Sequence, residues 1–223
     1  MTGQPISKSK ATLPQTIALF PLSGALLLPD GQLPLNIFEP RYLKMIDDVL
    51  GGARTIGMIQ PRDLPKKNDM APALYHVGCA GRITSFRESG DGRYLVSLTG
   101  VRRFRLIEEI DVEAPYRTAR IDWDAFDIDA HKDASGADVD REAFVEIMSD
   151  YLDTEGLKTD WDAVEEAPIE SLVASLSMGC PFAPNEKQAL LEAITVADRA
   201  KILMALMEMS GAADEPGEFG PLQ

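Results

Sequence analysis

The hydrophobic pattern differs between the two halves of the chain, and this difference limits the folds that the sequence can adopt. Up to residue 123, short apolar runs alternate with glycine, proline and aspartate turn signals, which is typical of β-strands. From residue 139 onward, apolar residues recur at the three-to-four spacing of amphipathic helices. The sequence therefore predicts an α+β protein in which a β-rich part precedes a helical part.

The β-rich part is predicted to cover residues 14–123 and to form a small, partly closed barrel of six or seven strands and one helix. A Ser-Gly-Asp-Gly turn at 89–92 indicates a hairpin, and glycines inside the expected strands, such as Gly100, are typical of bulges and tight corners. The amphipathic run 40–52, which ends in two glycines, predicts the helix. The expected strands are 16–22, 33–38, 55–60, 74–88, 93–100, 101–110 and 116–124.

The remaining residues divide into a linker, a helical subdomain and two terminal segments. Pro168 and Pro184 suit the first helical position of two helices, and Thr195-x-x-Asp198 resembles a capping box that opens a third. An amphipathic run at 140–154 predicts a further helix. We expect a flexible leader at 1–13, an acidic linker at 124–138, the helical subdomain at 139–210 and a disordered tail at 211–223.

Charge is distributed unevenly along the chain. Residues 1–106 contain 14 basic and 8 acidic residues, a net charge of +6, whereas residues 107–223 contain 8 and 28, a net charge of −20. An overall acidic protein is a poor general ligand for nucleic acid, although its basic half could bind locally. Two distant cysteines without metal spacing, and an apolar N-terminal run broken by Pro21, predict a cytoplasmic protein with no membrane contact. The sequence does not fix the oligomeric state.

The sequence contains no arrangement typical of a catalytic, metal or cofactor site. It has no Gly-Lys pair and therefore no phosphate-binding loop, and it has no Gly-x-Ser-x-Gly elbow. Of its two histidines, His76 sits in an expected strand and His131 in the acidic linker. A weak metal site at His131 lacks the glycine of a calcium loop. We therefore expect a protein that is not an enzyme and holds no metal or cofactor.

The stretch LNIFEPRY at 35–42 permits two interpretations, a strand-to-helix corner or part of a ligand site. As a corner, Phe38 enters the barrel core, Glu39 lies at the positive end of a helix dipole, and Pro40 occupies the first helical turn. Arg41 then bonds a carboxylate or strand carbonyls, and Tyr42 begins the apolar face of the helix. The corner interpretation predicts that Arg41→Ala destabilises the fold more than it changes binding.

Arg102, Arg103 and Arg105 form a compact basic cluster in an expected strand. Alternation along a strand places Arg103 and Arg105 on one face and Arg102 on the other. Arginines beside an aromatic residue could contact RNA. The alternative is that they pair with nearby acids such as Glu108 or Glu109, or with acids of the helical half.

Three stretches together resemble one family. They are IALFPLSGALLLPDGQLPLNIFEPRYLKMI, LTGVRRFRLI and SLVASLSMGCPFAPNEKQALLEAITVADRAKILMALMEM. They are similar to the N-terminal domain of Lon ATP-dependent protease, and more closely to free-standing bacterial proteins made of that domain alone, in which FEPRY is the usual form of the motif. The resemblance covers residues 14–209 and implies a PUA-like β-barrel packed on a helical subdomain. It implies recognition of unfolded or degron-bearing polypeptides, without the ATPase and Ser-Lys peptidase of Lon.

The resulting functional hypothesis is a non-catalytic binding module, an adaptor or regulator in protein quality control with a possible protease or ATPase partner. The apolar edge 26–35 offers main-chain pairing to an extended peptide, or is ordinary barrel core. The alternatives are an RNA-binding PUA-like protein and a scaffold with a specific folded partner. The expected polypeptide contacts are Leu28, Pro29, Leu33 and Pro34, with Phe38, Arg41 and Tyr42 behind them, and the expected structural residues are Glu39, Pro40, Gly100, Arg103 and Arg105.

Overall fold

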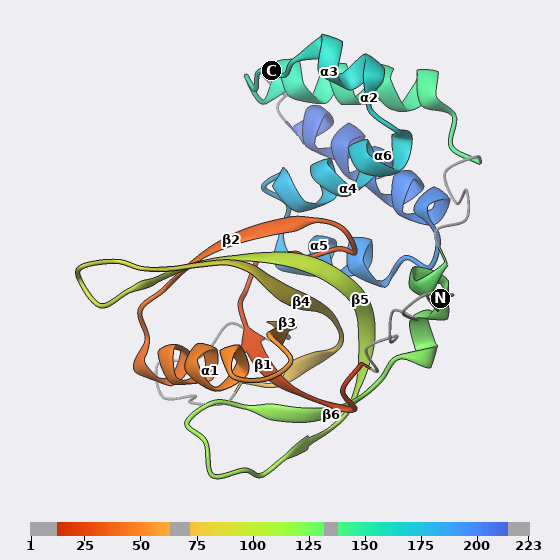
Figure 1. Ribbon diagram of the computed structural model, residues 1–223. Coiled ribbons are helices and arrows are strands. Elements are labelled where there is room, and N and C mark those ends of the chain that lie inside the picture. The colour runs from red at the N-terminus through yellow and green to blue at the C-terminus, as the bar shows by residue number, and fades with distance from the viewer. Residues whose placement is uncertain (1–12, 63–71, 132–137, 214–223) are drawn as a thin grey trace, which may run out of the picture.

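The computed structural model describes residues 13–62, 72–131 and 138–213, and it is an α+β fold as the sequence predicts. The described strands are β1 (Thr16–Pro21), β2 (Gln32–Ile37), β3 (Thr55–Pro61), β4 (Leu74–Glu88), β5 (Tyr94–Ile110) and β6 (Thr118–Asp122). The helices are α1 (Pro40–Leu50), the 3-10 helix η1 (Asp124–Ala130), α2 (Arg141–Thr154), α3 (Trp161–Glu166), α4 (Ile169–Gly179), α5 (Pro184–Glu192) and α6 (Val196–Ala213). Figure 1 shows the strands wrapped into a barrel with α2–α6 gathered on one side of it.

The described strands close into a barrel because the long strand β5 pairs with three neighbours. The sheet order is β2-β5-β4-β3-β1-β6, and β5 also pairs with β6, which completes the ring. β1 and β3 run parallel, and the other pairings are antiparallel. β2 pairs only with β5 in this sheet, so it forms an edge beside the ring.

The two strands predicted at 93–100 and 101–110 are one strand of 17 residues, and this correction has a local cause. Gly100 pairs with Gly81 and Arg102 pairs with Ala80, so Val101 is an extra residue in the ladder. A bulge of this kind bends and twists a strand without ending it. Gly100, which in the sequence is typical of a bulge or tight corner, therefore lies at a bulge, and the chain does not reverse there.

Apolar side chains form two buried clusters. The smaller one fills the barrel beneath Phe104 and includes Leu19, Ile59 and Ile121. The larger one begins under α1, continues past Leu98 in β5 and extends into the helical part as far as Phe144 and Leu203. Because this second cluster crosses from barrel to helices, the two parts share one hydrophobic core.

Several helical features differ from the sequence predictions. Helix α3 was not predicted, because six residues are too few for a clear helical period. Pro168 is the N-cap of α4 rather than its first helical residue. The segment 124–138, expected to be a linker, contains η1 at 124–130, and α6 continues to Ala213, into the expected tail. The leader at 1–12 and the tail from 214 onward lie outside the described residues.

Candidate functional site

A groove runs between the edge strand β2 and helix α4. Its larger part has a volume of about 680 Å³ and is lined on one side by the continuous segment 29–34 and on the other by α4 residues from Glu170 to Gly179. A smaller part of about 260 Å³ continues toward η1 and the start of α6. Pro29, Asp30, Glu170 and Ala174 line both parts. The groove therefore joins the barrel to the helical half along an open strand edge.

The side chains of β2 alternate in a way that explains the groove wall. Leu33, Leu35 and Ile37 turn inward and are half-buried or buried, whereas Gln32, Pro34 and Asn36 are exposed. Alternation of this kind is typical of a strand with one face on the core. Pro34 donates no N–H, which a strand tolerates at the edge of a sheet.

Two glycines hold the 28–31 turn close to its neighbours. A Cβ on Gly100 would lie 1.9 Å from the carbonyl oxygen of Leu28, and a Cβ on Gly31 would lie 2.4 Å from the Met178 sulfur. The Asp30 amide donates to the Gly100 carbonyl at 3.0 Å, and the Gly100 amide donates to the Gly31 carbonyl at 2.8 Å. The absence of side chains at both glycines therefore lets the turn lie between β5 and α4.

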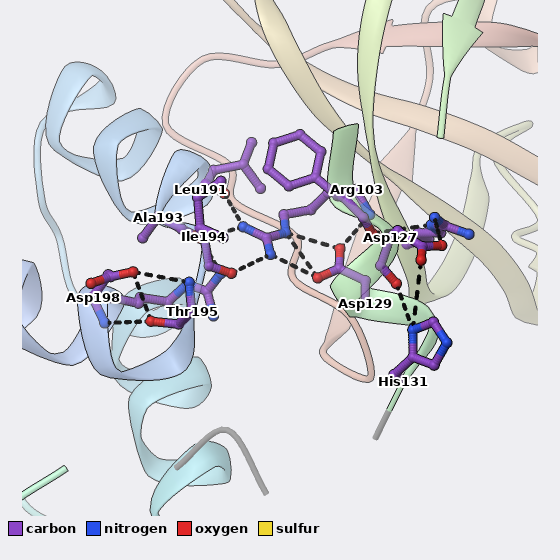
Figure 2. A network of polar contacts seen from close by, with 12 residues as sticks. Arg103, Asp127, Asp129, His131, Leu191, Ala193, Ile194, Thr195 and Asp198 are labelled. Atoms are coloured by element: carbon purple, nitrogen blue, oxygen red, sulfur yellow. Dashed lines mark hydrogen bonds and ion pairs between the residues drawn. The ribbon is translucent and has the colours of Figure 1, made fainter. Parts of the chain in front are cut away.

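Arg103 forms the floor of the smaller part of the groove, and Figure 2 shows its network. Its Nε donates to Asp129 at 2.9 Å and its Nη2 donates to the other carboxylate oxygen at 2.7 Å. The remaining N–H groups donate to the carbonyls of Leu191, Ala193 and Ile194. All five guanidinium donors are thus engaged, and the side chain is only 2% exposed.

This network connects three segments that are far apart in sequence. Asp129 comes from η1 and also accepts from the Arg103 amide at 2.9 Å, while the three carbonyls belong to the end of α5 and the turn after it. The last carbonyls of a helix lack partners within the helix and carry partial negative charge. Arg103 satisfies these carbonyls, and the Phe126 ring lies 4.4 Å from its guanidinium carbon.

Arg199 of α6 donates further hydrogen bonds to the carbonyls at the end of α5. Its Nε donates to the Leu190 carbonyl at 2.8 Å and its Nη2 donates to the Ala193 carbonyl at 3.2 Å. Burial and the neighbouring Arg103 charge lower the pKa of Arg199 to about 10, so it remains protonated at neutral pH. In the sequence, Arg199 is a lone arginine on the apolar side of the predicted helix, a pattern that can indicate a buried, fully bonded arginine.

A second polar contact between barrel and helices involves two buried glutamines. The Gln60 amide nitrogen donates to the Pro184 carbonyl at 3.0 Å and to the Gln188 side-chain oxygen at 3.2 Å. Gln188 in turn donates to the Val77 carbonyl at 3.2 Å. Within the described part of the chain, every buried side-chain nitrogen and oxygen has a hydrogen-bond partner.

Arg102 and Arg103 of the basic cluster pair with acids, as one of the two alternatives predicted, but these acids belong to η1. Arg102 bonds Asp127 at 2.9 Å as well as the Trp123 and Phe126 carbonyls. The adjacent Phe104 fills the barrel. Of the two arginines predicted to share a face, Arg103 is buried and Arg105 is exposed. The saturated guanidinium of Arg103 therefore offers no donor to RNA.

The segment 38–42 forms a strand-to-helix corner outside the groove. Phe38 is 61% exposed, so the prediction that its ring enters the core is wrong; its neighbour Ile37 faces the core instead. Glu39 is the N-cap of α1, Pro40 begins the helix, and Tyr42 packs edge-on against Phe20 at 4.4 Å. Arg41 bonds Glu39 at 2.8 Å on the surface, and an exposed pair contributes little stability, so its truncation need not destabilise the fold.

The structure brings together four of the seven expected polypeptide contacts. Leu28, Pro29, Leu33 and Pro34 line the groove, although Leu28 is itself buried. Phe38, Arg41 and Tyr42 lie at the corner instead. Glu170 and Met178 of α4 also line the groove, and no local sequence pattern indicates that α4 approaches β2.

The described residues contain no group of three or more histidine, cysteine, aspartate or glutamate side chains arranged to hold a metal ion. His131 contacts the Asp127 carbonyl through Nδ1 at 3.1 Å and is exposed. Both Cys79 and Cys180 are buried free thiols, and burial raises the pKa of each. In the ranges that the structure describes, no helix has both the length and the apolar character needed to cross a bilayer.

Comparison with known proteins assigns the chain to a family. The family model of the ATP-dependent protease La (LON) substrate-binding domain matches residues 16–209. The chain belongs to this family. "Lon protease 2" of Sorangium cellulosum is 28% identical over 214 residues, and "Lon protease 2" of Myxococcus xanthus is 26% identical over 206. These alignments cover 92% and 89% of this chain but 26% and 24% of the relatives, so the chain spans about a quarter of their length.

Solved structures show the same fold at low sequence identity. The Lon N-terminal domain protein from Xanthomonas campestris has a TM-score of 0.59 at 22% identity, covering 85% of this chain and 97% of that one. The N-terminal domain of Lon protease from the Mycobacterium avium complex has a TM-score of 0.61 at 14% identity, covering 86% and 98%. The barrel with attached helices is therefore the fold of the Lon N-terminal domain.

Proposed function

We propose that this chain is a polypeptide-recognition module that binds exposed apolar segments of unfolded or degron-bearing proteins in the groove between β2 and α4. Membership of the Lon substrate-binding family supports polypeptide recognition as the general role. The observation that carries the proposal is an edge strand beside a groove whose lining includes Leu33, Pro34, Ala174 and Met178. Both features are needed to receive an extended chain, because main-chain pairing gives affinity and pockets give selectivity.

In this proposal an extended segment of the bound polypeptide lies beside β2, and it can run in either direction along that strand. Its backbone bonds the open main-chain groups of β2, except at Pro34, which can offer only its carbonyl. Every second side chain then points into the groove, toward Leu33, Ala174 and Met178. Recognition through backbone and apolar surface tolerates many sequences, which suits a protein that binds unfolded clients.

The proposal gives the chain a binding role and assigns it no chemistry of its own. A binding module can act as an adaptor that delivers clients to a protease or ATPase, or as a competitor that withholds them. Both roles require the groove to be open to a client. The same groove residues would therefore matter in either case.

The test is fluorescence anisotropy of a labelled, permanently unfolded protein titrated with this chain at low and moderate salt. We expect saturable binding in the micromolar range that survives moderate salt, because apolar burial is not screened. Ser175→Arg, an exposed position in the groove, should weaken it, and Thr154→Arg, exposed on α2, should not. Equal affinity for both variants would reject the groove as the site, and no binding by the parent chain would reject the function.

A further inference from the structure

We propose that the groove selects segments in which a lysine or arginine neighbours an apolar residue, and that Glu170 recognises the basic side chain. This inference rests on the proposed function and specifies its ligand class. Three features of the groove support it. The two parts of the groove have different linings, the arginines on the floor of the smaller part are engaged in internal bonds, and two carboxylates lie where the two parts join.

The two parts of the groove differ in what lines them. The larger part presents Leu33, Pro34, Ala174 and Met178, a surface suited to an apolar side chain. The smaller part extends over the Arg103–Asp129 pair. Glu170 and Asp30 line both parts, so these two carboxylates mark the junction. An extended chain crossing the junction would place one side chain in the larger part and a nearby one beside Glu170.

The charged groups on the floor of the smaller part are committed to internal bonds. Arg103 uses all five of its donors, and both oxygens of Asp129 accept from it. Arg199 is 6% exposed and donates to the Leu190 and Ala193 carbonyls. The donors of Arg103 and Arg199 are therefore engaged in internal bonds, and a ligand at the junction contacts the half-buried Glu170 carboxylate.

The shape of the smaller part suits a long basic side chain. Ala174, Ile194 and Val196 line it together with Glu170, so an aliphatic stem can lie against apolar surface while its charged end reaches the carboxylate. A guanidinium can bond both carboxylate oxygens, and an ammonium can bond one. The net charge of −20 on residues 107–223 also attracts basic segments from a distance.

The experiment compares three labelled twelve-residue peptides that differ at one position between leucines: lysine, norleucine or glutamate. Anisotropy titrations use the whole chain, its Glu170→Gln and Glu170→Lys variants, and Glu166→Gln as a control at an exposed position of α3. Circular dichroism establishes that each variant is folded. We expect the parent chain to prefer lysine over norleucine about fivefold, the upper range for a partly exposed ion pair.

Glu170→Gln should remove the lysine preference while norleucine binding stays unchanged, Glu166→Gln should keep it, and Glu170→Lys should shift the preference to glutamate. Equal affinity of the parent chain for lysine and norleucine peptides would overturn the inference and leave the proposed function standing. So would a lysine preference that survives in Glu170→Gln. If no peptide binds, including norleucine, the proposed function itself fails and this inference fails with it.

Discussion

At the scale of single residues, Arg103 is the side chain on which the junction of barrel and helices most depends. Replacing it with alanine removes the guanidinium from the buried Asp129 carboxylate, which keeps only the backbone amide of residue 103 as a donor. It also frees the Leu191 and Ile194 carbonyls, while the Ala193 carbonyl keeps its bond from Arg199. Breaking a buried pair in this way costs about 3–5 kcal/mol. We predict that Arg103→Ala lowers the free energy of unfolding by that amount in urea titrations.

Arg105→Ala is the matched control, since this arginine lies two positions further along the same strand and is exposed. Its effect should stay within about 0.5 kcal/mol. If the two alanine variants unfold at the same urea concentration, the Arg103 network does not hold the two parts together.

Lys187 gives a pH-dependent prediction at the same scale. It is 7% exposed, donates to the Met178 carbonyl at 3.3 Å, and its pKa is lowered from 10.5 by burial. The unfolded chain therefore binds this proton more readily than the folded chain as pH approaches 10.5, so this group makes stability rise with pH in that window. Lys187→Met should retain or gain stability at pH 7 and lack this rise.

Urea midpoints of the parent chain and Lys187→Met at pH 7 and at about pH 10 check the prediction. The difference between the two proteins should shift in favour of the parent chain at the higher pH. A variant that is clearly less stable at pH 7 would show that the ammonium contributes more through its bond than burial costs.

At the scale of elements, the start of α6 is a further testable point. Thr195 and Asp198 form a reciprocal cap: the Asp198 amide donates to the Thr195 hydroxyl at 3.0 Å, and the Thr195 amide donates to the Asp198 carboxylate at 3.3 Å. Thr195→Ala should lower the free energy of unfolding by about 1 kcal/mol. Thr154→Ala removes an exposed hydroxyl bond within α2 and should matter less. Equal losses in thermal unfolding would contradict this role.

Elements defined by local pattern were predictable, and those defined by distant contacts were not. The strand at 33–38 and the capping sequence at 195–198 lie within single segments, so the sequence alone predicts them, although the inward face predicted for Phe38 is wrong. Gly100 indicates a bulge or tight corner, but the continuation of β5 through Val101 depends on pairing with β4, and the burial of Asp129 depends on Arg103 and α5. The same limit applies to the groove: its β2 wall was predicted, and its α4 wall was not.

At the scale of the whole molecule, the shared apolar core and the two polar junctions predict that barrel and helices unfold together. A Trp161→Phe variant leaves Trp123, next to the barrel, as the reporter of that part, while far-ultraviolet circular dichroism follows the helices. The two signals should give one urea midpoint. Separate midpoints would show two independently stable units joined only by chain connectivity.

The most direct measurement of the central claim is photo-crosslinking from the groove to a labelled, permanently unfolded polypeptide. A benzophenone side chain replaces Ser175, which lines the groove, or Lys201, which is exposed on α6. The account predicts saturable crosslinking from position 175, competed by excess unlabelled polypeptide, and only background from position 201. Crosslinking that is equal at both positions, or absent from 175 while the polypeptide binds, would contradict the placement of the client along β2 and α4.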